Sequence, residues 1–333
     1  MLDAAQVQIP GQAATQLGCF TTRQALDAGW TRRQLDDAAG ASLTKVRHGV
    51  WVETAVRQAA DDRLRHAMTV QAELLVLGPR WYAARRSAAV LSGLPLIGAP
   101  PLRAQLLAEP RYRQERSNVR HRQLAPLPPS ERGTALTVPC TMAHRTAMDL
   151  ARREPFRNGV VVADAVLRQG VDRRWLLAAL APMKGWPGVE RARRVAEFAD
   201  GLAESPLESI SRVAIHELGL PAPELQVEVW LGDRFLGRVD KLWRQFNTVG
   251  EADGFGKYGA DPAASFKLSK VREDWLEDVG LEVARWGWDE AWRPAGVLDR
   301  RLERAFARGV RQQLDPRVRF VPTTVVEGLR RSA

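Results

Sequence analysis

The sequence has few cysteines and no long apolar run. Among its 333 residues only Cys19 and Cys140 carry a thiol, which excludes a disulfide framework and a CxxC metal knuckle. We expect both thiols to be small buried groups. The first segment, MLDAAQVQIPGQ, has no basic stretch followed by an apolar one, and no stretch approaches the length of a membrane span. These absences predict a cytoplasmic protein that does not bind a membrane.

Common cofactor patterns are missing as well. The chain has no phosphate-binding loop and no dinucleotide fingerprint. His48, His66, His121 and His144 have no partner at the spacing of metal ligands. His216 lies in the apolar helical stretch RVAIHELGL, where a packed or surface histidine is favoured over a catalytic base. The histidines therefore provide no catalytic candidate.

What the chain has in excess is positive charge. It carries 49 Lys and Arg against 39 Asp and Glu, a formal net charge of +10. Residues 1–80 hold 9 basic and 8 acidic side chains, residues 201–333 hold 20 and 21, and residues 81–200 hold 20 and 10. The whole surplus therefore lies in the middle, which favours a polyanionic partner. The alternative is that these arginines are solvated and bind nothing in particular. The arginines most suited to a phosphate backbone are Arg103, Arg111, Arg113, Arg116, Arg120 and Arg122.

The N-terminal segment predicts two short helices and a hairpin. TTRQALDAGW has Thr21 or Thr22 as a helix cap and ends at Gly29, and Thr31 caps TRRQLDDAAG two residues later. SLTKVRHGVWV then predicts two strands around a tight His-Gly turn. Polar and basic side chains in the first turn of a second helix can reach base edges in a major groove. The segment thus predicts a winged helix-turn-helix.

The last third predicts an ordered series of elements. ESPLESISRVAIHELGL predicts a helix, LQVEVWL, RFLGRVDKLW and FNTVGEADG predict three strands, KLSKVREDWLEDVG predicts a helix, and LEVARWGW predicts a closing strand. Acidic residues fall on the second and third strands. Asp240 and Glu251 are 11 positions apart, which leaves room for a turn that brings them side by side. Strand alternation places Glu251 and Asp253 on one face.

Part of the chain resembles a known family of DNA-binding proteins. The stretch CFTTRQALDAGWTRRQLDD, followed by KVRHGVWV, resembles the N-terminal winged-helix domain of AbiEi antitoxins from type IV toxin–antitoxin systems. RRSAAVLSGLPLIG resembles the helix that follows in that group. The resemblance implies binding to double-stranded DNA, typically the protein's own promoter, and a cognate toxin as a further partner. The residues that match the second helix and the wing are Arg32, Arg33, Gln34, Lys45 and Arg47.

A second resemblance runs from about residue 204 to residue 288. Helix, three strands, helix and strand is the core order of the PD-(D/E)XK nuclease fold, and the segment is similar to the DUF559 and very-short-patch-repair-like branch of that superfamily. The resemblance implies hydrolysis of phosphodiesters at a site where carboxylates hold Mg²⁺. It implies Glu208, Asp240 and Glu251 as metal ligands. The catalytic set would be Asp240, Glu251, Asp253 and Lys257.

The chain departs from the nuclease pattern at one position. The superfamily has a lysine two residues after the second-strand acid, and this chain has Asp253 there. Lys257, or Lys267 or Lys270 at the start of the next helix, would have to reach the same point. The alternative is that the acids are strand-end residues paired with basic neighbours, namely Arg238, Lys241 or Arg272.

These features predict an α+β multidomain chain, because its length exceeds what one hydrophobic core usually supports. The expected parts are a winged helix-turn-helix (1–55), a mainly helical basic middle region with short strands (56–200), a restriction-endonuclease-like α/β domain (201–295), and a C-terminal helix and tail (296–333). Residues 56–95 are expected to be helical, with Gly78-Pro79 between two helices and Gly93-Leu94-Pro95 closing the second.

Three functions fit this organisation. The first is a DNA-binding regulator or antitoxin with a nuclease-like scaffold. The second is a Mg²⁺-dependent endonuclease that its winged helix targets to DNA. The third is an interaction module that neutralises a toxin by direct contact.

Overall fold

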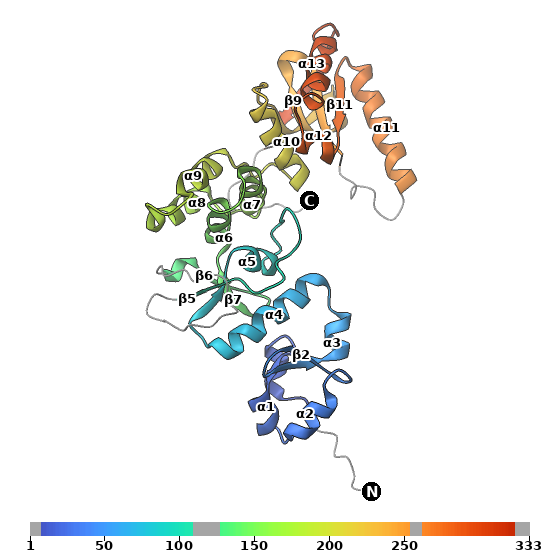
Figure 1. Cartoon of the computed structure of the whole chain (residues 1–333). Helices are drawn as coiled ribbons and strands as arrows, with labels where there is room; N and C mark the ends of the chain where they lie inside the picture. The colour runs from blue at the N-terminus through green and yellow to red at the C-terminus, as the bar shows by residue number, and fades with distance from the viewer. Residues whose placement is uncertain (1–7, 109–126, 254–261, 324–333) are drawn as a thin grey trace. The chain divides into compact units, whose positions relative to one another are not determined.

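The computed structural model describes residues 8–108, 127–253 and 262–323. It is a mixed α and β chain with several sheets (Figure 1), as predicted at that level. Internal contacts divide it into two compact units. The first comprises residues 1–154 and 174–193, and the second comprises residues 155–173 and 194–333.

The first unit begins with two short capped helices and a hairpin. Thr21 and Thr31 each accept a hydrogen bond from the backbone of a glutamine three residues later, and that glutamine's side chain accepts one in return. These reciprocal capping boxes start both helices where the sequence predicts them. The strands pair antiparallel in the order β1-β3-β2. The elements are η1 (Gly11–Thr15), β1 (Phe20–Thr21), α1 (Thr22–Asp27), α2 (Arg32–Ala38), β2 (Leu43–Arg47) and β3 (Val50–Glu53).

The rest of the first unit packs helices around a second sheet, of order β5-β4-β7-β6. The break between two helices at Gly78 lies where it was expected, but the expectation that the second helix includes residues 81–83 was wrong, because these residues form β4. Gly78, at φ 92°, ends the preceding helix, and Trp81 and Ala83 then alternate into the core as strand residues. The elements are α3 (Thr54–Ala59), α4 (Asp62–Leu77), β4 (Trp81–Ala83), α5 (Arg85–Leu91), β5 (Leu106–Ala108), η2 (Pro129–Glu131), β6 (Arg132–Ala135), β7 (Val138–Thr141), α6 (Ala143–Ala151), α8 (Arg173–Leu180) and η3 (Ala181–Met183). Helix α9 (Val189–Phe198) contributes residues to both units.

The second unit contains a five-stranded sheet of order β11-β10-β9-β8-β12. Strands β10 and β11 are parallel, and the other neighbours are antiparallel. The helix, three strands, helix and strand follow one another as predicted, and Ser205 caps the first helix. The elements are α7 (Phe156–Arg168), α10 (Pro206–Glu217), β8 (Glu224–Leu231), β9 (Arg234–Trp243), η4 (Arg244–Phe246), β10 (Thr248–Ala252), α11 (Pro262–Asp278), β11 (Glu282–Trp286), α12 (Trp288–Trp292), α13 (Leu298–Gly309) and β12 (Val318–Pro322).

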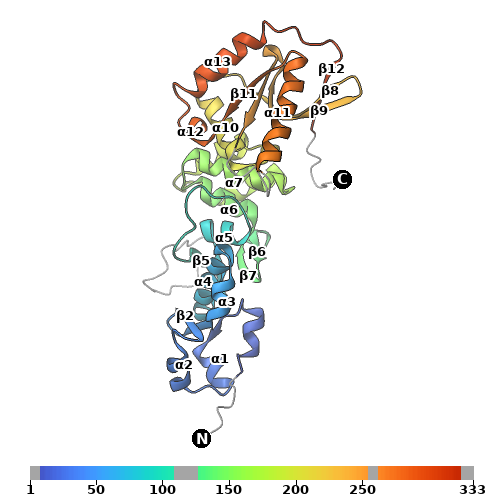
Figure 2. The same cartoon turned by 90° about the vertical axis from the view of Figure 1, so that its right-hand side faces the viewer.

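Helices cover both faces of this sheet (Figure 2). Leu276 and Val279 of α11 share one apolar cluster with Leu242 and Val249 of the sheet. On the other face, Trp286 donates a hydrogen bond to Ser211 of α10 at 2.7 Å, and α13 packs against the sheet there too. The α11 face and the α10 face therefore present different side chains of the same strands.

Two expectations from absences can be compared with the structure. Cys19 and Cys140 are both buried and neither forms a disulfide, which confirms the expectation for these thiols. Within the described ranges, no helix has both the length and the apolar composition that crossing a bilayer requires.

Candidate nucleic-acid interface and carboxylate site

The first turn of α2 presents predicted DNA-binding residues to solvent. Arg32 and Arg33 are exposed, and Arg33 lies 3.9 Å from Asp37, with side chains 92% and 73% exposed. Such a pair leaves the guanidinium available to another anion. Gln34 also lies here, but its side-chain oxygen accepts from the backbone and the hydroxyl of Thr31 at 2.8 Å. Its role in the structure is to cap the helix.

The two hairpin residues predicted to contact phosphate, Lys45 and Arg47, lie in different environments. Lys45 is exposed and its Nζ lies 5.2 Å from the centre of the Trp51 ring. Arg47 instead forms a 2.6 Å ion pair with Glu73 of α4, and both side chains are about four-fifths buried. The structure therefore places Lys45 at the surface and ties Arg47 to the helix behind the hairpin.

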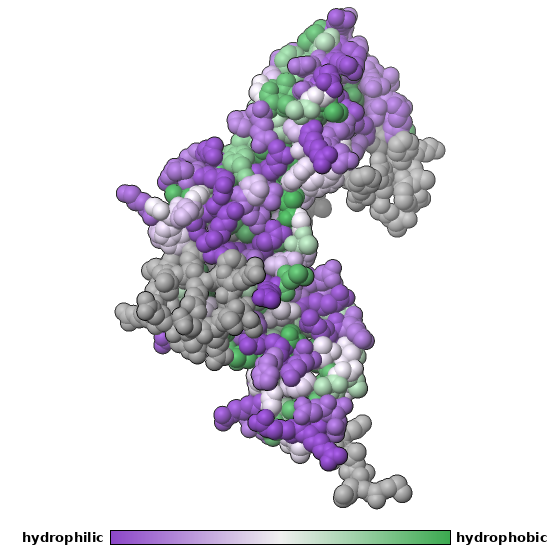
Figure 3. All heavy atoms as spheres, viewed as in Figure 1, coloured by the Kyte–Doolittle hydropathy of each residue, from purple (hydrophilic) through white to green (hydrophobic). Residues whose placement is uncertain are grey.

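Arg23 of α1 is a further surface cation that the sequence interpretation missed. It lies in the first turn of α1 with its side chain 91% exposed, 3.9 Å from Asp27. Its position directly after the predicted cap was the available signal. On the face shown in Figure 3, hydrophilic residues cover much of this N-terminal part.

The two central carboxylates of the second unit lie on neighbouring strands. Gly250 of β10 pairs with Lys241 of β9 in an antiparallel register, which sets Glu251 opposite Asp240. Asp240 is 9% exposed and Glu251 is 1% exposed. One Asp240 oxygen accepts a hydrogen bond from the backbone N–H of Ala252 at 3.0 Å. The strand pairing thus brings together the two acids that the sequence singled out.

Arginines neutralise the carboxylates on this side of the sheet. Arg272 of α11 donates to Glu251 at 2.8 Å, which confirms one of the pairings considered as the alternative to a metal site. Asp253 accepts a hydrogen bond from the Arg285 guanidinium at 3.0 Å. The same guanidinium also forms an ion pair with Glu273 of α11 at 2.7 Å. These ion pairs occupy carboxylate oxygens that a metal ion would otherwise use.

Glu208 belongs to the α10 face instead. Its carboxylate accepts hydrogen bonds from the Ser205 hydroxyl at 2.8 Å, from the Glu204 backbone at 2.9 Å and from the Gln226 amide at 2.9 Å. The Glu208 carboxylate therefore caps the N-terminus of α10, while the Glu251 carboxylate contacts α11. Within the described ranges, no three His, Cys, Asp or Glu side chains gather closely enough to hold a metal ion.

Lys257, Lys267 and Lys270 are the lysines that could replace the one missing from the nuclease pattern. Lys257 lies outside the described residues. Lys270 is exposed and pairs with Glu273 at 3.0 Å on its own helix.

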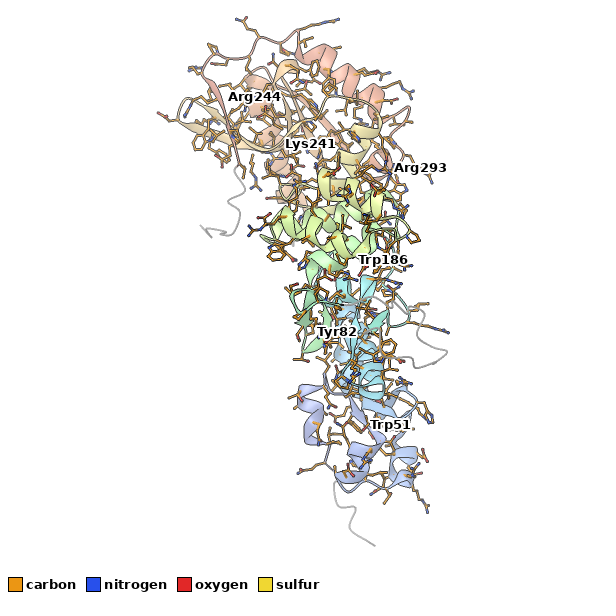
Figure 4. All side chains as sticks on the ribbon, turned by 90° about the vertical axis from the view of Figure 1, so that its left-hand side faces the viewer. Trp51, Tyr82, Trp186, Lys241, Arg244 and Arg293 are labelled. Atoms are coloured by element: carbon orange, nitrogen blue, oxygen red, sulfur yellow. The ribbon has the colours of Figure 1, made fainter. Side chains whose placement is uncertain are left out.

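The structure also reveals a buried lysine, Lys241, that was not proposed for the site. Its side chain is fully buried and its Nζ lies 5.4 Å from the centre of the Trp286 ring. Within the described residues this Nζ has no hydrogen-bond partner. Burial lowers the pKa of Lys241, and nearby Asp240 opposes that shift. Figure 4 shows it among the strands of the sheet.

A group of arginines on α13 was also not predicted. Arg300, Arg304 and Arg308 are four residues apart, so they lie along one side of the helix. With Arg301 they line an open cavity of about 400 Å³. The i, i+4, i+8 spacing was the available sequence signal. Helix α13 covers the face of the sheet opposite α11, so this group is separate from the Glu251 carboxylate.

The comparisons with known proteins give relatives but no family. No family model matches the chain. The chain is similar to two proteins of Mycobacterium tuberculosis, the uncharacterized protein MT2308 of strain CDC 1551 / Oshkosh and the uncharacterized protein Rv2248 of strain ATCC 25618 / H37Rv. Each is 31% identical over 164 residues, which are 49% of this chain and 60% of the relative.

Proposed function

We propose that the chain is a DNA-binding protein of the antitoxin or transcriptional-regulator type. The observation that carries the proposal is the first turn of α2, where Arg32 and Arg33 extend from a capped second helix beside an antiparallel hairpin that presents Lys45. In a winged helix-turn-helix this turn enters the major groove and the hairpin meets the phosphate backbone. The resemblance of this segment to AbiEi antitoxins supports promoter DNA as the target.

In this proposal the C-terminal part is a nuclease-like scaffold. Its strand order supports the restriction-endonuclease-like assignment, and the arginine partners of Glu251 and Asp253 favour a structural role for those acids. A scaffold of this kind would contact DNA or a cognate toxin, and a toxin gene directly downstream would support the antitoxin form.

The test is sequence-specific binding by the full chain. Affinity for the DNA upstream of its own gene is compared with affinity for a random duplex of equal length over a salt series. We expect preference for the upstream DNA, and we expect the double variant Arg32→Ala, Arg33→Ala to lose it. Arg193→Ala, an exposed arginine on α9, should bind as the unaltered chain does. Equal affinity for both duplexes would rule out specific repression.

A Mg²⁺-dependent endonuclease is the second candidate, and the cross-strand placement of Asp240 and Glu251 favours it. Mg²⁺ is commonly held by one or two carboxylates together with water and substrate phosphate, so these two residues fit such an ion. Glu208 does not fit as a third ligand because its oxygens cap α10. A bound Mg²⁺ would supply charge stabilisation at the phosphate. Asp240 and Glu251 would hold it, and Arg272 would have to release Glu251.

Cleavage of plasmid DNA with Mg²⁺ or Mn²⁺ tests this candidate. We expect an active enzyme to lose cleavage in Asp240→Asn and in Glu251→Gln. Asp274→Asn, which changes an exposed carboxylate on α11, is the matched control. Absence of cleavage under every metal condition, or cleavage that persists in both site variants, would reject the endonuclease while leaving the DNA-binding proposal intact.

A further inference from the structure

Three arginines are buried together in the first unit, away from the surfaces described above. Arg85 is the first residue of α5, Arg145 lies in α6, and Arg152 directly follows α6. Their exposed fractions are 4%, 0% and 4%. Arginine is rarely buried unless paired, since its guanidinium stays charged at neutral pH. Each of these guanidiniums is therefore expected to have anionic or hydrogen-bonding partners.

Two of the three arginines are only partly satisfied. Arg145 donates to Asp149 at 2.8 Å and to Glu131, but among the residues that the structure describes its Nη2 has no hydrogen-bond partner. Arg152 donates to the carbonyl of Pro187 at 2.8 Å and lies 3.7 Å from Asp149 and 4.7 Å from the centre of the Trp186 ring. Its Nε is buried with no hydrogen-bond partner in the described part of the chain.

Arg85 is the least satisfied of the three arginines. Within the described residues its side chain forms no hydrogen bond and no ion pair, and its Nη1 is buried. Burial lowers its pKa to about 10, and the charges of Arg153, Arg152 and Arg145 add to that shift while Asp149 opposes it. The group therefore remains protonated at neutral pH, surrounded mainly by charges of its own sign.

The backbone at Arg85 is also strained. Its φ is 54°, in the left-handed region that residues other than glycine, asparagine and aspartate seldom adopt. Strain of this kind persists where the surroundings impose it, often at binding sites. Here it accompanies a side chain that is buried against other cations.

We propose that Arg85, Arg145 and Arg152 form a binding site for a small tetrahedral oxyanion of the phosphate class. Such an anion supplies the missing negative charge and accepts the unused N–H groups of all three guanidiniums, whose planar forks suit phosphate oxygens. The three side chains are at most 4% exposed, so a duplex cannot reach them. The site is thus distinct from the α2 surface, and in a regulator it would hold an effector.

The experiment measures anion-dependent stability of the full chain. Thermal unfolding and titration calorimetry are carried out with inorganic phosphate, with adenosine monophosphate, and with chloride at matched ionic strength. We expect saturable binding and a rising melting temperature with phosphate but not with chloride, because a ligand that binds only the folded state stabilises it. An equal response to adenosine monophosphate would show that the site also accepts the phosphate group of a phosphomonoester.

Variants separate a binding site from a structural arginine. Arg85→Met should abolish the phosphate response, and Arg85→Lys, which keeps the charge but loses the fork, should weaken binding about tenfold or more. Arg65→Met, which changes an exposed arginine on α4 of the same unit, should respond as the unaltered chain does. No saturable phosphate binding by the unaltered chain, or an unchanged response in Arg85→Met, would overturn the proposal. Calorimetry on the unaltered chain decides the question even if a variant fails to fold.

Discussion

Helices α2 and α6 carry the same charge pattern with opposite outcomes. Each has an arginine followed four residues later by an aspartate, Arg33 and Asp37 on α2 and Arg145 and Asp149 on α6. On α2 the pair is 3.9 Å apart with side chains 92% and 73% exposed, and on α6 it is 2.8 Å apart with side chains 1% and 0% exposed. The sequence spacing is therefore the same, while the burial and the distance between the charged groups differ.

This difference indicates what each arginine can do. An exposed pair is screened by water and salt and contributes little to stability, so Arg33 is available for a partner. A buried pair cannot be broken without leaving a charge in a medium that solvates it poorly, so Arg145 holds the fold. Function and stability should then respond to different substitutions.

The largest effect is expected at Arg145. Arg145→Met removes the cation that pairs with both of the buried carboxylates of Asp149 and Glu131, and we expect it to lower the free energy of unfolding by about 3–5 kcal/mol. Urea denaturation of the full chain measures this change. The matched substitution Arg33→Met should shift the transition by much less. Similar losses in the two variants would show that burial does not distinguish the pairs.

An intermediate effect is expected for Arg272, which lies between the two extremes. Its side chain is 33% exposed and its partner Glu251 is 2% exposed, with 2.8 Å between them. Arg272→Met should cost about 1–3 kcal/mol, because one buried carboxylate loses a charged partner that is itself part solvated. The same denaturation experiment gives the value. A loss as large as that of Arg145→Met would contradict a graded dependence on exposure.

A smaller effect, with a defined pH dependence, is expected from Asp164. Burial raises its pKa to about 6, although Arg212 at 2.8 Å opposes the shift. Between that value and the ordinary pKa of 3.8 the folded chain holds a proton that the unfolded chain lacks. Its contribution to stability is therefore lost as pH rises through about 6 and regained as pH falls.

This contribution should amount to about 1 kcal/mol between pH 7 and pH 5. Comparing unfolding of the unaltered chain and of Asp164→Asn at both pH values isolates it from other titrating groups. The aspartate chain should gain more stability on acidification than the asparagine variant. Parallel pH responses in the two proteins would show that Asp164 does not titrate in this range.

The smallest effect on stability is expected at Arg33. Arg33→Ala should change the free energy of unfolding by no more than about 0.5 kcal/mol. Its effect should appear in DNA binding instead, as a slope of log affinity against log salt that is shallower by about 1. Gel-shift or anisotropy titrations over a salt series measure the slope. An unchanged slope would mean that Arg33 meets no phosphate, and base contact would then have to be tested by altering the DNA.

Local signals in the sequence were sufficient for the helix starts but not for the partners of charged residues. Thr31 was identified as a cap, and Thr21 as one of two neighbouring candidates, because a cap depends on neighbours within three residues. Arg47 was assigned to the surface because its partner Glu73 is 26 residues away and belongs to another helix. The pairing of β12 with β8 was missed for the same reason, since neither strand reveals its neighbour locally.

At the candidate site, too, the sequence predicted what depends on chain order but not what depends on packing. The order of elements placed Asp240 and Glu251 on adjacent strands, because a hairpin of that length fixes their register. Which face of the sheet received Glu208, and which arginine reached Glu251, depended on how α10 and α11 pack. Packing of that kind is decided by the whole core, so residues such as Lys241 and Arg272 acquired defined positions only in the folded chain.

Strand β12 covers one edge of the five-stranded sheet, beside β8. It pairs with β8 from Val318 to Pro322 and so occupies backbone groups that would otherwise be open to any extended chain. Its own outer side is short and includes a proline, which cannot donate to a new strand, and the exposed Arg319. A chain truncated before Val318 would expose the edge of β8, and we expect it to aggregate by strand addition, which light scattering would detect.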